Sequence, residues 1–222
     1  MNSVSKAWDW KRERGAIWRT PSEESYYIAA HWKRQGYKDL LDFGCGLGRH
    51  AVYFARQGFC VSAFDLSEDG VQSLSRWAEE EGLEIPTAVC DMQELPYPED
   101  RFDCIFAYHV ISHTDTAGMV RILSEIKRVL RPGGEVYLSL CSKETWSFQE
   151  AGYPALDDNT VVKTEEGPEQ GVPHFFVSLE DVMELFSGFE LQRIRHVDDC
   201  YFDGQKRNSK HYFILARLPD HR

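Results

Sequence analysis

Three closely spaced glycines, followed at a distance by an aspartate, have the clearest spacing for ligand chemistry in this chain. Gly44, Gly46 and Gly48 come directly after the apolar run 40–43. Such glycines let the main chain approach a ligand without a Cβ in the way, and the N–H groups that open a following helix can hold a phosphate or a carboxylate. Asp65, 19 residues after Gly46 and at the end of the next apolar run, is placed to accept both hydroxyls of a ribose. The spacing therefore predicts a site for an adenosine-containing cofactor.

Position 49 separates two kinds of adenosine cofactor. The dinucleotide-binding fingerprint needs a third glycine, five residues after the first, so that the helix packs closely beside a pyrophosphate. This chain has Arg49 there. The sequence thus disfavours NAD, and a nicotinamide-dependent oxidoreductase stays a lesser alternative.

The elements that must position these residues alternate along the chain from residue 39 onward. Apolar runs alternate with amphipathic segments, which is typical of parallel strands joined by helical crossovers. The predicted strands are Leu40–Phe43, Cys60–Phe64, Thr87–Cys90, Cys104–Tyr108 and Glu135–Cys141. The predicted helices are about 49–57 ending at Gly58, about 68–81 between Ser67 and Gly82, and about 116–130 stopped by Pro132-Gly133-Gly134. The apolar stripe expected on the third helix is Val120, Leu123, Ile126, Lys127 and Leu130.

The segment from Lys143 to Phe176 has a different composition. It is rich in proline and glycine, and its seven acids against two lysines leave a charge of −5. Connections of this length inside a compact domain are usually lids or binding loops, unless they are disordered. After it, Ser178 is expected to cap a helix to about Phe186, and Phe189–Val197 and His211–Leu218 are expected to form an antiparallel pair around the Asp203-Gly204 turn region.

Composition excludes several classes of partner. The net charge of −11 argues against nucleic acid, whose binders cluster Lys and Arg against phosphates. The basic residues among the N-terminal tryptophans are expected to form the solvated face of a short helix, and these residues are Lys11, Arg12, Arg14 and Arg19. The six cysteines form no CxxC pair, which favours free, mostly buried thiols in a reducing compartment. With no secretory signal and no run near the roughly 20 apolar residues that span a bilayer, we expect a cytoplasmic protein without a membrane partner.

Four motifs in order resemble those of the class I S-adenosylmethionine-dependent methyltransferases. They are LLDFGCGLGRH, VSAFDLS, AVCDMQELPYPEDRFDCIFAYHVISH and RILSEIKRVLRPGGEVYLSL, and together they cover about residues 38–141. The resemblance implies an α/β fold with a three-layer, doubly wound, seven-stranded, mostly parallel sheet whose last strand is antiparallel. It also implies that S-adenosylmethionine is bound by Asp42, Gly44, Cys45, Gly46, Asp65, Leu66, Asp91, Met92 and Ala107.

Within that set, the resemblance gives each group its part of the cofactor. Asp65 and Leu66 would lie at the ribose, Asp91 and Met92 at the adenine, and Ala107 at the sulfonium, with Tyr108 beside it. An aspartate in Asp91's place is otherwise a helix N-cap, and a methionine a core filler.

Methyl transfer from a sulfonium is a direct displacement, so such a site mainly aligns the nucleophile, the methyl group and the sulfur. If a base is needed, the candidates are His109, Tyr108 and His113, with His109 preferred; His113 could instead be packed beside the cofactor. We predict no metal site, because no acid lies between His109 and His113 and two ligands do not make a site. The candidate acceptor residues are Trp18, Tyr26, Tyr27 and His174.

The sequence predicts one methyltransferase domain over residues 1–222, with an N-terminal helical cap (1–37) and a lid or substrate insert (143–177). The acceptor is expected to be a small molecule, since the Asn/Asp-Pro-Pro-Tyr/Phe motif of nucleic-acid amino methyltransferases is replaced by Ala107-Tyr108-His109-Val110. The acidic insert suits a cationic or neutral acceptor, or merely solubilises a loop. The protein is expected to be a monomer or homodimer, and a non-catalytic S-adenosylmethionine-binding regulator is the main alternative.

Overall fold

The computed structural model describes residues 6–10, 15–201 and 207–220. In this part of the chain, ten strands join in one sheet in the order β3-β2-β1-β4-β5-β8-β7-β6, and β10 pairs with β5 and with β9. The first five strands are β1 (Asp39–Phe43), β2 (Cys60–Asp65), β3 (Thr87–Val89), β4 (Phe102–Ala107) and β5 (Leu130–Ser142). Their apolar residues form continuous runs because both faces of the sheet are covered.

The path β3-β2-β1-β4-β5-β10-β9 is the predicted seven-stranded sheet. The first five strands of this path are parallel, and β10 (Ser209–Arg217) runs antiparallel between β5 and β9 (Glu190–Asp199). The fold prediction is therefore confirmed, including the antiparallel last strand. The predicted turn at Asp203-Gly204 lies outside the described residues.

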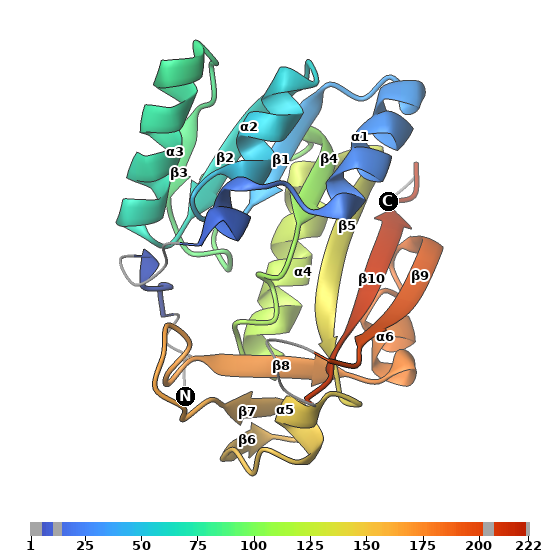
Figure 1. The fold of residues 1–222 in the computed structure, drawn as a ribbon. Helices are drawn as coiled ribbons and strands as arrows, with labels where there is room; N and C mark the ends of the chain where they lie inside the picture. Colours follow the sequence, from blue (N-terminus) through green and yellow to red (C-terminus); the bar gives the residue numbers. More distant parts are fainter. Residues whose placement is uncertain (1–5, 11–14, 202–206, 221–222) are drawn as a thin grey trace.

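Helices cover both faces of this sheet, which makes three layers (Figure 1). One apolar cluster packs α1 (Glu23–Gln35), α2 (Arg49–Arg56) and α3 (Glu68–Glu81) on one face. A second cluster packs α4 (Thr116–Val129) and α6 (Leu179–Leu185) on the other face. The carboxyl ends of the parallel strands are thus left at one edge, where ligands of such sheets bind.

The ends of these helices have the caps that the sequence predicts. The Ser67 hydroxyl accepts the Gly70 N–H at the start of α3, and Gly82 ends that helix in the left-handed conformation. Ser178 and Asp181 form a capping box at the start of α6. These boundaries fix where the strands on either side begin.

The helix α4 corrects two predictions. It ends at Val129, because the chain already pairs with β4 from Leu130 onward, and Pro132-Gly133-Gly134 lies within β5 instead of stopping the helix. Val120, predicted on the apolar stripe, is 59% exposed. The buried face consists instead of Met119, Ile122, Leu123, Ile126 and Val129. The glycine and proline spacing gave the end of the helix too late, and the stripe out of phase.

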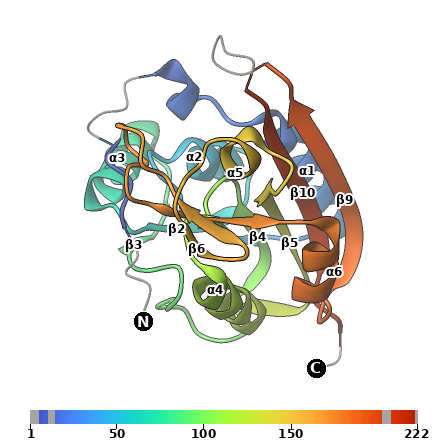
Figure 2. The same ribbon diagram turned by 90° about the horizontal axis from the view of Figure 1, so that it is seen from below.

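The insert after β5 is ordered and adds strands. It contains α5 (Trp146–Gln149), β6 (Ala155–Asp157), β7 (Thr160–Val162) and β8 (Pro173–Val177). β6, β7 and β8 pair antiparallel, and β8 extends the main sheet by pairing parallel with the end of β5. The insert lies across the carboxyl edge of the sheet (Figures 1 and 2).

The N-terminal region is helical at η2 (Ala16–Arg19) and α1. Three of the four basic residues expected on a helix face, Lys11, Arg12 and Arg14, lie outside the described residues. All six thiols are free, but only Cys45 and Cys104 are fully buried. Within the described residues, no helix has the length and apolar character needed to cross a membrane.

Candidate cofactor and acceptor site

The glycine turn between β1 and α2 has the geometry that its composition predicts. Gly44, Gly46 and Gly48 have φ values of 73°, 52° and 97°, a region that side chains with a Cβ rarely adopt. A Cβ on Gly44 would lie 2.2 Å from a methyl group of Val110, and one on Gly46 would lie 2.5 Å from the Trp10 ring. The turn therefore has no space for side chains at these positions, and its backbone lines the carboxyl edge of the sheet.

Asp65, at the end of β2, is bonded to this turn. One of its carboxylate oxygens accepts the Gly46 N–H at 2.8 Å, and the other accepts the Ser67 N–H at 2.8 Å. Burial raises the pKa of Asp65, and these N–H groups oppose the rise. Each oxygen keeps a lone pair, so the carboxylate can both hold the loop and accept ribose hydroxyls.

Asp42 is the buried acid of this region. It is 2% exposed, and its Oδ2 has no hydrogen-bond partner among the described residues. Burial raises the pKa of Asp42 to about 7, against the opposing effects of the Ala51 N–H and the Arg49 charge. An unpaired buried oxygen costs stability unless a ligand pairs with it, so this atom is a candidate contact for a cationic group of the cofactor.

The remaining predicted cofactor residues follow the strand ends. Cys45 is buried, and its N–H donates to the Phe64 carbonyl. Asp91 accepts the Gln93 N–H at 2.9 Å, a local turn contact and not a helix cap, while Met92 packs against the core. Leu66 follows Asp65 directly, and Ala107 ends β4 fully buried. The strand ends therefore bring the predicted residues to one edge of the sheet.

Tyr108 and His109 follow β4 at the same edge. Their rings lie 4.1 Å apart, and His109 has a φ of 52°. Its backbone N–H donates to the Ser139 hydroxyl at 2.7 Å, and Nδ1 lies 3.2 Å from that hydroxyl, so β5 fixes the position of the ring.

Electrostatics set the protonation of both side chains. Dense surroundings and the nearby His211 lower the pKa of His109 well below its ordinary value, although the residue keeps an exposed surface. Exposure combined with dense surroundings places the imidazole in the wall of a hollow, where it is neutral and able to accept a proton. Burial raises the pKa of Tyr108, which therefore remains protonated at neutral pH.

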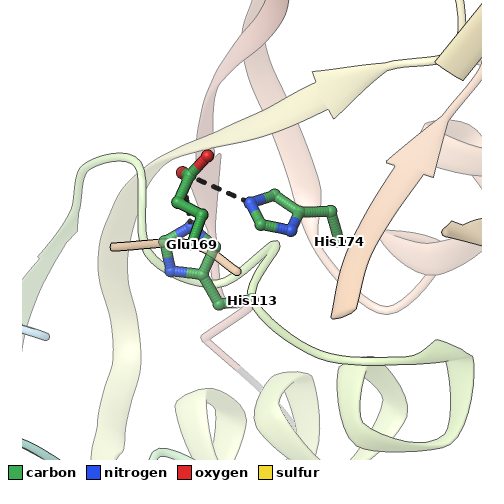
Figure 3. Close-up of side chains that lie close together, drawn as sticks. All are labelled: His113, Glu169 and His174. Atoms are coloured by element: carbon green, nitrogen blue, oxygen red, sulfur yellow. Dashed lines mark ion pairs between the residues drawn. The ribbon is translucent and has the colours of Figure 1, made fainter. Parts of the chain in front are cut away.

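His113 and His174 are brought together by the insert (Figure 3). Their ring centroids are 4.8 Å apart, and Glu169 lies between them with Oε1 at 3.8 Å from His113 Nε2 and 3.3 Å from His174 Nε2. Burial, followed by the neighbouring His174, lowers the pKa of His113 to about 3. The pKa of Glu169 is lowered by His174 and Lys163, which outweigh its burial. Sequence analysis proposed both histidines but missed Glu169 and Lys163, since no local spacing connects them.

Three tryptophans close over the same edge. The rings of Trp8, Trp10 and Trp18 lie 5.2 to 6.0 Å apart, and Trp8 also lies 5.6 Å from the His113 ring. Arg49 donates to the Ile17 carbonyl at 3.0 Å, and its guanidinium lies over the Trp18 and Tyr108 rings. The residue that replaces the third glycine thus holds the N-terminal segment against the site. Trp8 and Trp10 were not among the predicted site residues.

Tyr26 and Tyr27 are not brought into this cluster. Both are about half exposed on α1, where Tyr26 packs on Tyr53 and Tyr27 stacks on His31. The helix α1 covers one face of the sheet, so these side chains lie away from its carboxyl edge. Of the predicted N-terminal acceptor residues, only Trp18 contacts the site.

A separate hollow lies at the opposite edge of the sheet. Its volume is about 620 Å³, and it is lined by residues at the amino ends of β4 and β5, including Tyr37 and Arg131. Arg131 is paired with Asp39 and Asp103. No predicted site residue lines this hollow, and its charges are satisfied by each other.

The part of the chain that holds the glycine turn, Asp65 and Asp91 matches a known family. Residues 40–134 match the model of a family described as a methyltransferase domain. A SAM-dependent methyltransferase from Methanosarcina mazei has the same fold, with a TM-score of 0.70 and 20% identity over 82% of this chain and 92% of that chain. The chain carries a class I S-adenosylmethionine-dependent methyltransferase domain.

Other relatives of this methyltransferase domain are more distant or cover less of it. The Burkholderia thailandensis 1,6-didemethyltoxoflavin-N1-methyltransferase, solved with 1,6-didemethyltoxoflavin and S-adenosylhomocysteine, has a TM-score of 0.64 and 22% identity, covering 89% of this chain and 78% of that chain. The ubiquinone/menaquinone biosynthesis C-methyltransferase UbiE of Ralstonia pickettii is 33% identical over 134 residues, 58% of this chain and 52% of the relative. The chain spans about half or less of the length of the curated relatives it matches.

These likenesses confirm three predictions for the methyltransferase domain. They are the family, the Rossmann-like α/β fold and S-adenosylmethionine as the cofactor of the family. The solved structures are all too distant in sequence to carry more than the fold. The acceptor and the roles of individual residues rest on the geometry of this chain.

Proposed function

We propose that this protein transfers a methyl group from S-adenosylmethionine to a small-molecule acceptor at the carboxyl edge of its sheet. The observation that carries the proposal is the glycine turn bonded to Asp65, within the segment that matches the methyltransferase domain. The cofactor would lie across the turn, with Asp42 at its methionine end, Asp65 and Leu66 at the ribose, and Asp91 and Met92 at the adenine. Gly44, Cys45, Gly46 and Ala107 would complete its contacts.

The acceptor would lie beside His109. Displacement at a sulfonium needs the nucleophile, the methyl carbon and the sulfur in line, so most of the work of the site is alignment. His109, neutral because of its lowered pKa, is placed to accept the proton that an acidified acceptor loses. Tyr108 forms a wall beside it, and Trp18 covers the site through its contact with Arg49.

The cap and insert would exclude water from the reaction. Lys6 donates to the Gln170 carbonyl, and Trp8 lies against His113, so the N-terminal segment and the insert touch each other over the site. A single domain over 1–222, with a helical cap at 1–37 and a lid at 143–177, is consistent with these contacts. The charge of −11 and the small-molecule names of the relatives favour a small acceptor over nucleic acid, in a cytoplasmic monomer or homodimer.

Calorimetry with S-adenosylhomocysteine tests the cofactor site. The wild-type chain should bind with 1:1 stoichiometry, and Asp65→Asn should weaken binding at least about 100-fold, because an amide cannot accept from both a backbone N–H and a hydroxyl on its nitrogen. Glu68→Gln is the matched control, since it removes an exposed acid from the first turn of α3. Lack of binding by well-folded wild type would refute the proposal.

A labelled-methyl screen separates methyl transfer from the alternatives. Incubation with amines, thiols, phenols and carboxylates should identify at least one labelled product that requires His109. Saturable S-adenosylhomocysteine binding without any labelled product would favour the non-catalytic regulator. A fluorescence change on adding NADH would favour the oxidoreductase, and Arg49, packed on Trp18 at the dinucleotide position, argues against it.

A further inference from the structure

Two imidazoles and one carboxylate converge where the insert meets the end of β4. His113 follows β4, His174 is in β8, and Glu169 is in the loop before β8. One ligand atom from each, Nε2, Nε2 and Oε1, lies within 4.8 Å of the other two (Figure 3). This cluster does not belong to the glycine turn or to the predicted cofactor contacts.

The orientation of His174 is the decisive feature. The residue is 2% exposed, and its Nδ1 lies 3.0 Å from the Val172 carbonyl, which can only accept a hydrogen bond. Nδ1 therefore carries the proton, and the lone pair of the neutral ring is on Nε2. This Nε2 has no hydrogen-bond partner among the described residues, although it lies 3.3 Å from Glu169 Oε1.

Lone pairs of an imidazole and a carboxylate repel each other unless a cation lies between them. An N–H of a histidine held by a backbone carbonyl, with the other nitrogen aimed at a carboxylate, is also the arrangement that orients histidines in metal sites. His113 directs its own Nε2 to the same carboxylate oxygen, at 3.8 Å. Three electron-pair donors thus point to one small volume.

We propose that His113, Glu169 and His174 bind a divalent transition-metal ion. Two imidazoles with one carboxylate suit Zn²⁺, Co²⁺, Ni²⁺ or Fe²⁺, whereas Mg²⁺ and Ca²⁺ need mostly oxygen ligands. Ligands about 2.1 Å from a tetrahedral ion lie about 3.4 Å apart. The 3.3 Å and 3.8 Å separations are close to that value, and the longest one, at most 4.8 Å, has to shorten by at most about 1.4 Å.

Lys163 limits the strength of this site. Its ammonium pairs with Glu169 Oε2, which leaves Oε1 for the metal but adds a positive charge nearby. Three protein ligands leave at least one coordination position open. Because His113 is close enough to His109 for its charge to affect the pKa of His109, an acceptor oxygen or nitrogen bound at the open position would lie near the proposed base. This last step rests on the proposed methyl transfer, whereas metal binding does not.

Titration with Co²⁺ and Zn²⁺ tests the site directly. Tag-free, full-length protein, freed of metal with a chelator, should bind one equivalent of each ion, and Co²⁺ should give visible absorption bands that Zn²⁺ abolishes. Glu169→Gln and His113→Gln should each weaken binding at least about 100-fold, more than the 10- to 100-fold loss typical of second-shell residues. Lys163→Met should strengthen binding, because it removes the competing charge.

His196→Gln is the control, because it removes an imidazole from an exposed position on β9 and should leave metal affinity unchanged. Thermal unfolding of every variant shows whether it is folded, and His113→Gln, at a partly exposed residue, keeps the test open if His174→Gln does not fold. No stoichiometric binding by folded wild type, or equal affinity in Glu169→Gln, would overturn the site and leave a proton between His174 and Glu169. S-adenosylhomocysteine binding is measured on the same samples, so failure of the metal site and failure of the methyltransferase proposal are distinguishable.

Discussion

The two ends of the site are built in different ways. The cofactor end uses backbone groups and short acids at the ends of neighbouring strands, all within the 26 residues from Leu40 to Asp65 and the start of the next connection. The acceptor end uses long side chains from separate segments, such as His113 after β4 and Glu169 in the insert. One end depends on local geometry, and the other depends on how distant segments pack.

This difference explains why the two ends have different tolerance to change. A glycine at positive φ beside a packed side chain admits no substitution, so the cofactor end is restricted by its backbone. At the acceptor end, charge and side-chain identity decide what binds, and the scaffold tolerates other choices. We therefore expect substitutions at the cofactor end to change binding and stability, and substitutions at the acceptor end to change turnover.

The largest expected effect sharpens the acceptor end. His109→Asn keeps a residue that tolerates positive φ but removes the proposed base. With the acceptor found in the methyl screen, kcat should fall by roughly 10²- to 10⁴-fold, while S-adenosylhomocysteine affinity changes little. Because the pKa of His109 lies well below 6.5, the wild-type rate should be independent of pH from about 6 to 8 and fall only at lower pH. A rate that rises through pH 6.5 would contradict this role.

The next effect concerns the stability of the cofactor end. The pKa of Asp42 is about 7 in the folded protein and has its ordinary value near 3.8 in the unfolded chain, so between these values the folded state keeps a proton that the unfolded state has lost. The contribution of Asp42 to stability should therefore fall by roughly 4 kcal/mol as pH rises from about 4 to about 8. Urea unfolding of wild type and Asp42→Asn without cofactor should show this difference, and parallel pH profiles would count against it.

A smaller effect separates backbone strain from steric exclusion. Gly44→Ala places a methyl group against Val110 and should reduce S-adenosylhomocysteine affinity about 30-fold and lower stability by about 2 kcal/mol. Gly58→Ala is matched in conformation, with φ of 91° and no atom within 4 Å of the new Cβ. It should cost about 1 kcal/mol of stability and leave affinity within about twofold. Equal losses of affinity in both variants would remove the steric argument.

The smallest expected effect connects the two ends. Arg49→Gln removes the hydrogen bond to the Ile17 carbonyl and the contact with Trp18, which should weaken S-adenosylhomocysteine binding about fivefold and increase acrylamide quenching of tryptophan fluorescence. Arg56→Gln, on the same helix but in an exposed ion pair with Glu81, is the control. Unchanged quenching in Arg49→Gln would mean that the tryptophans are held by other contacts.

The contrast between the two ends also decides how much could be predicted from sequence. The strand order and the glycine turn were predicted correctly because apolar runs, caps and glycines act within a few residues of themselves. The strands of the insert were missed because proline and glycine suggested a loop, whereas β8 is stabilised by pairing with Cys141 and Ser142, more than 30 residues earlier. Glu169 was missed for the same reason, since only the folded insert places it beside His113. Tyr26 and Tyr27 were selected by proximity in sequence, which does not determine the face of a helix.

The N-terminal tryptophans have a kinetic consequence. Trp10 lies against Gly46 in the cofactor turn, and Trp8, two residues earlier, lies beside His113 at the acceptor end. One short strap thus spans both ends, and neither product can leave freely while both rings stay in place. Exchange of the two substrates would then follow a fixed order, and the opening of the strap, instead of methyl transfer itself, would set the turnover rate.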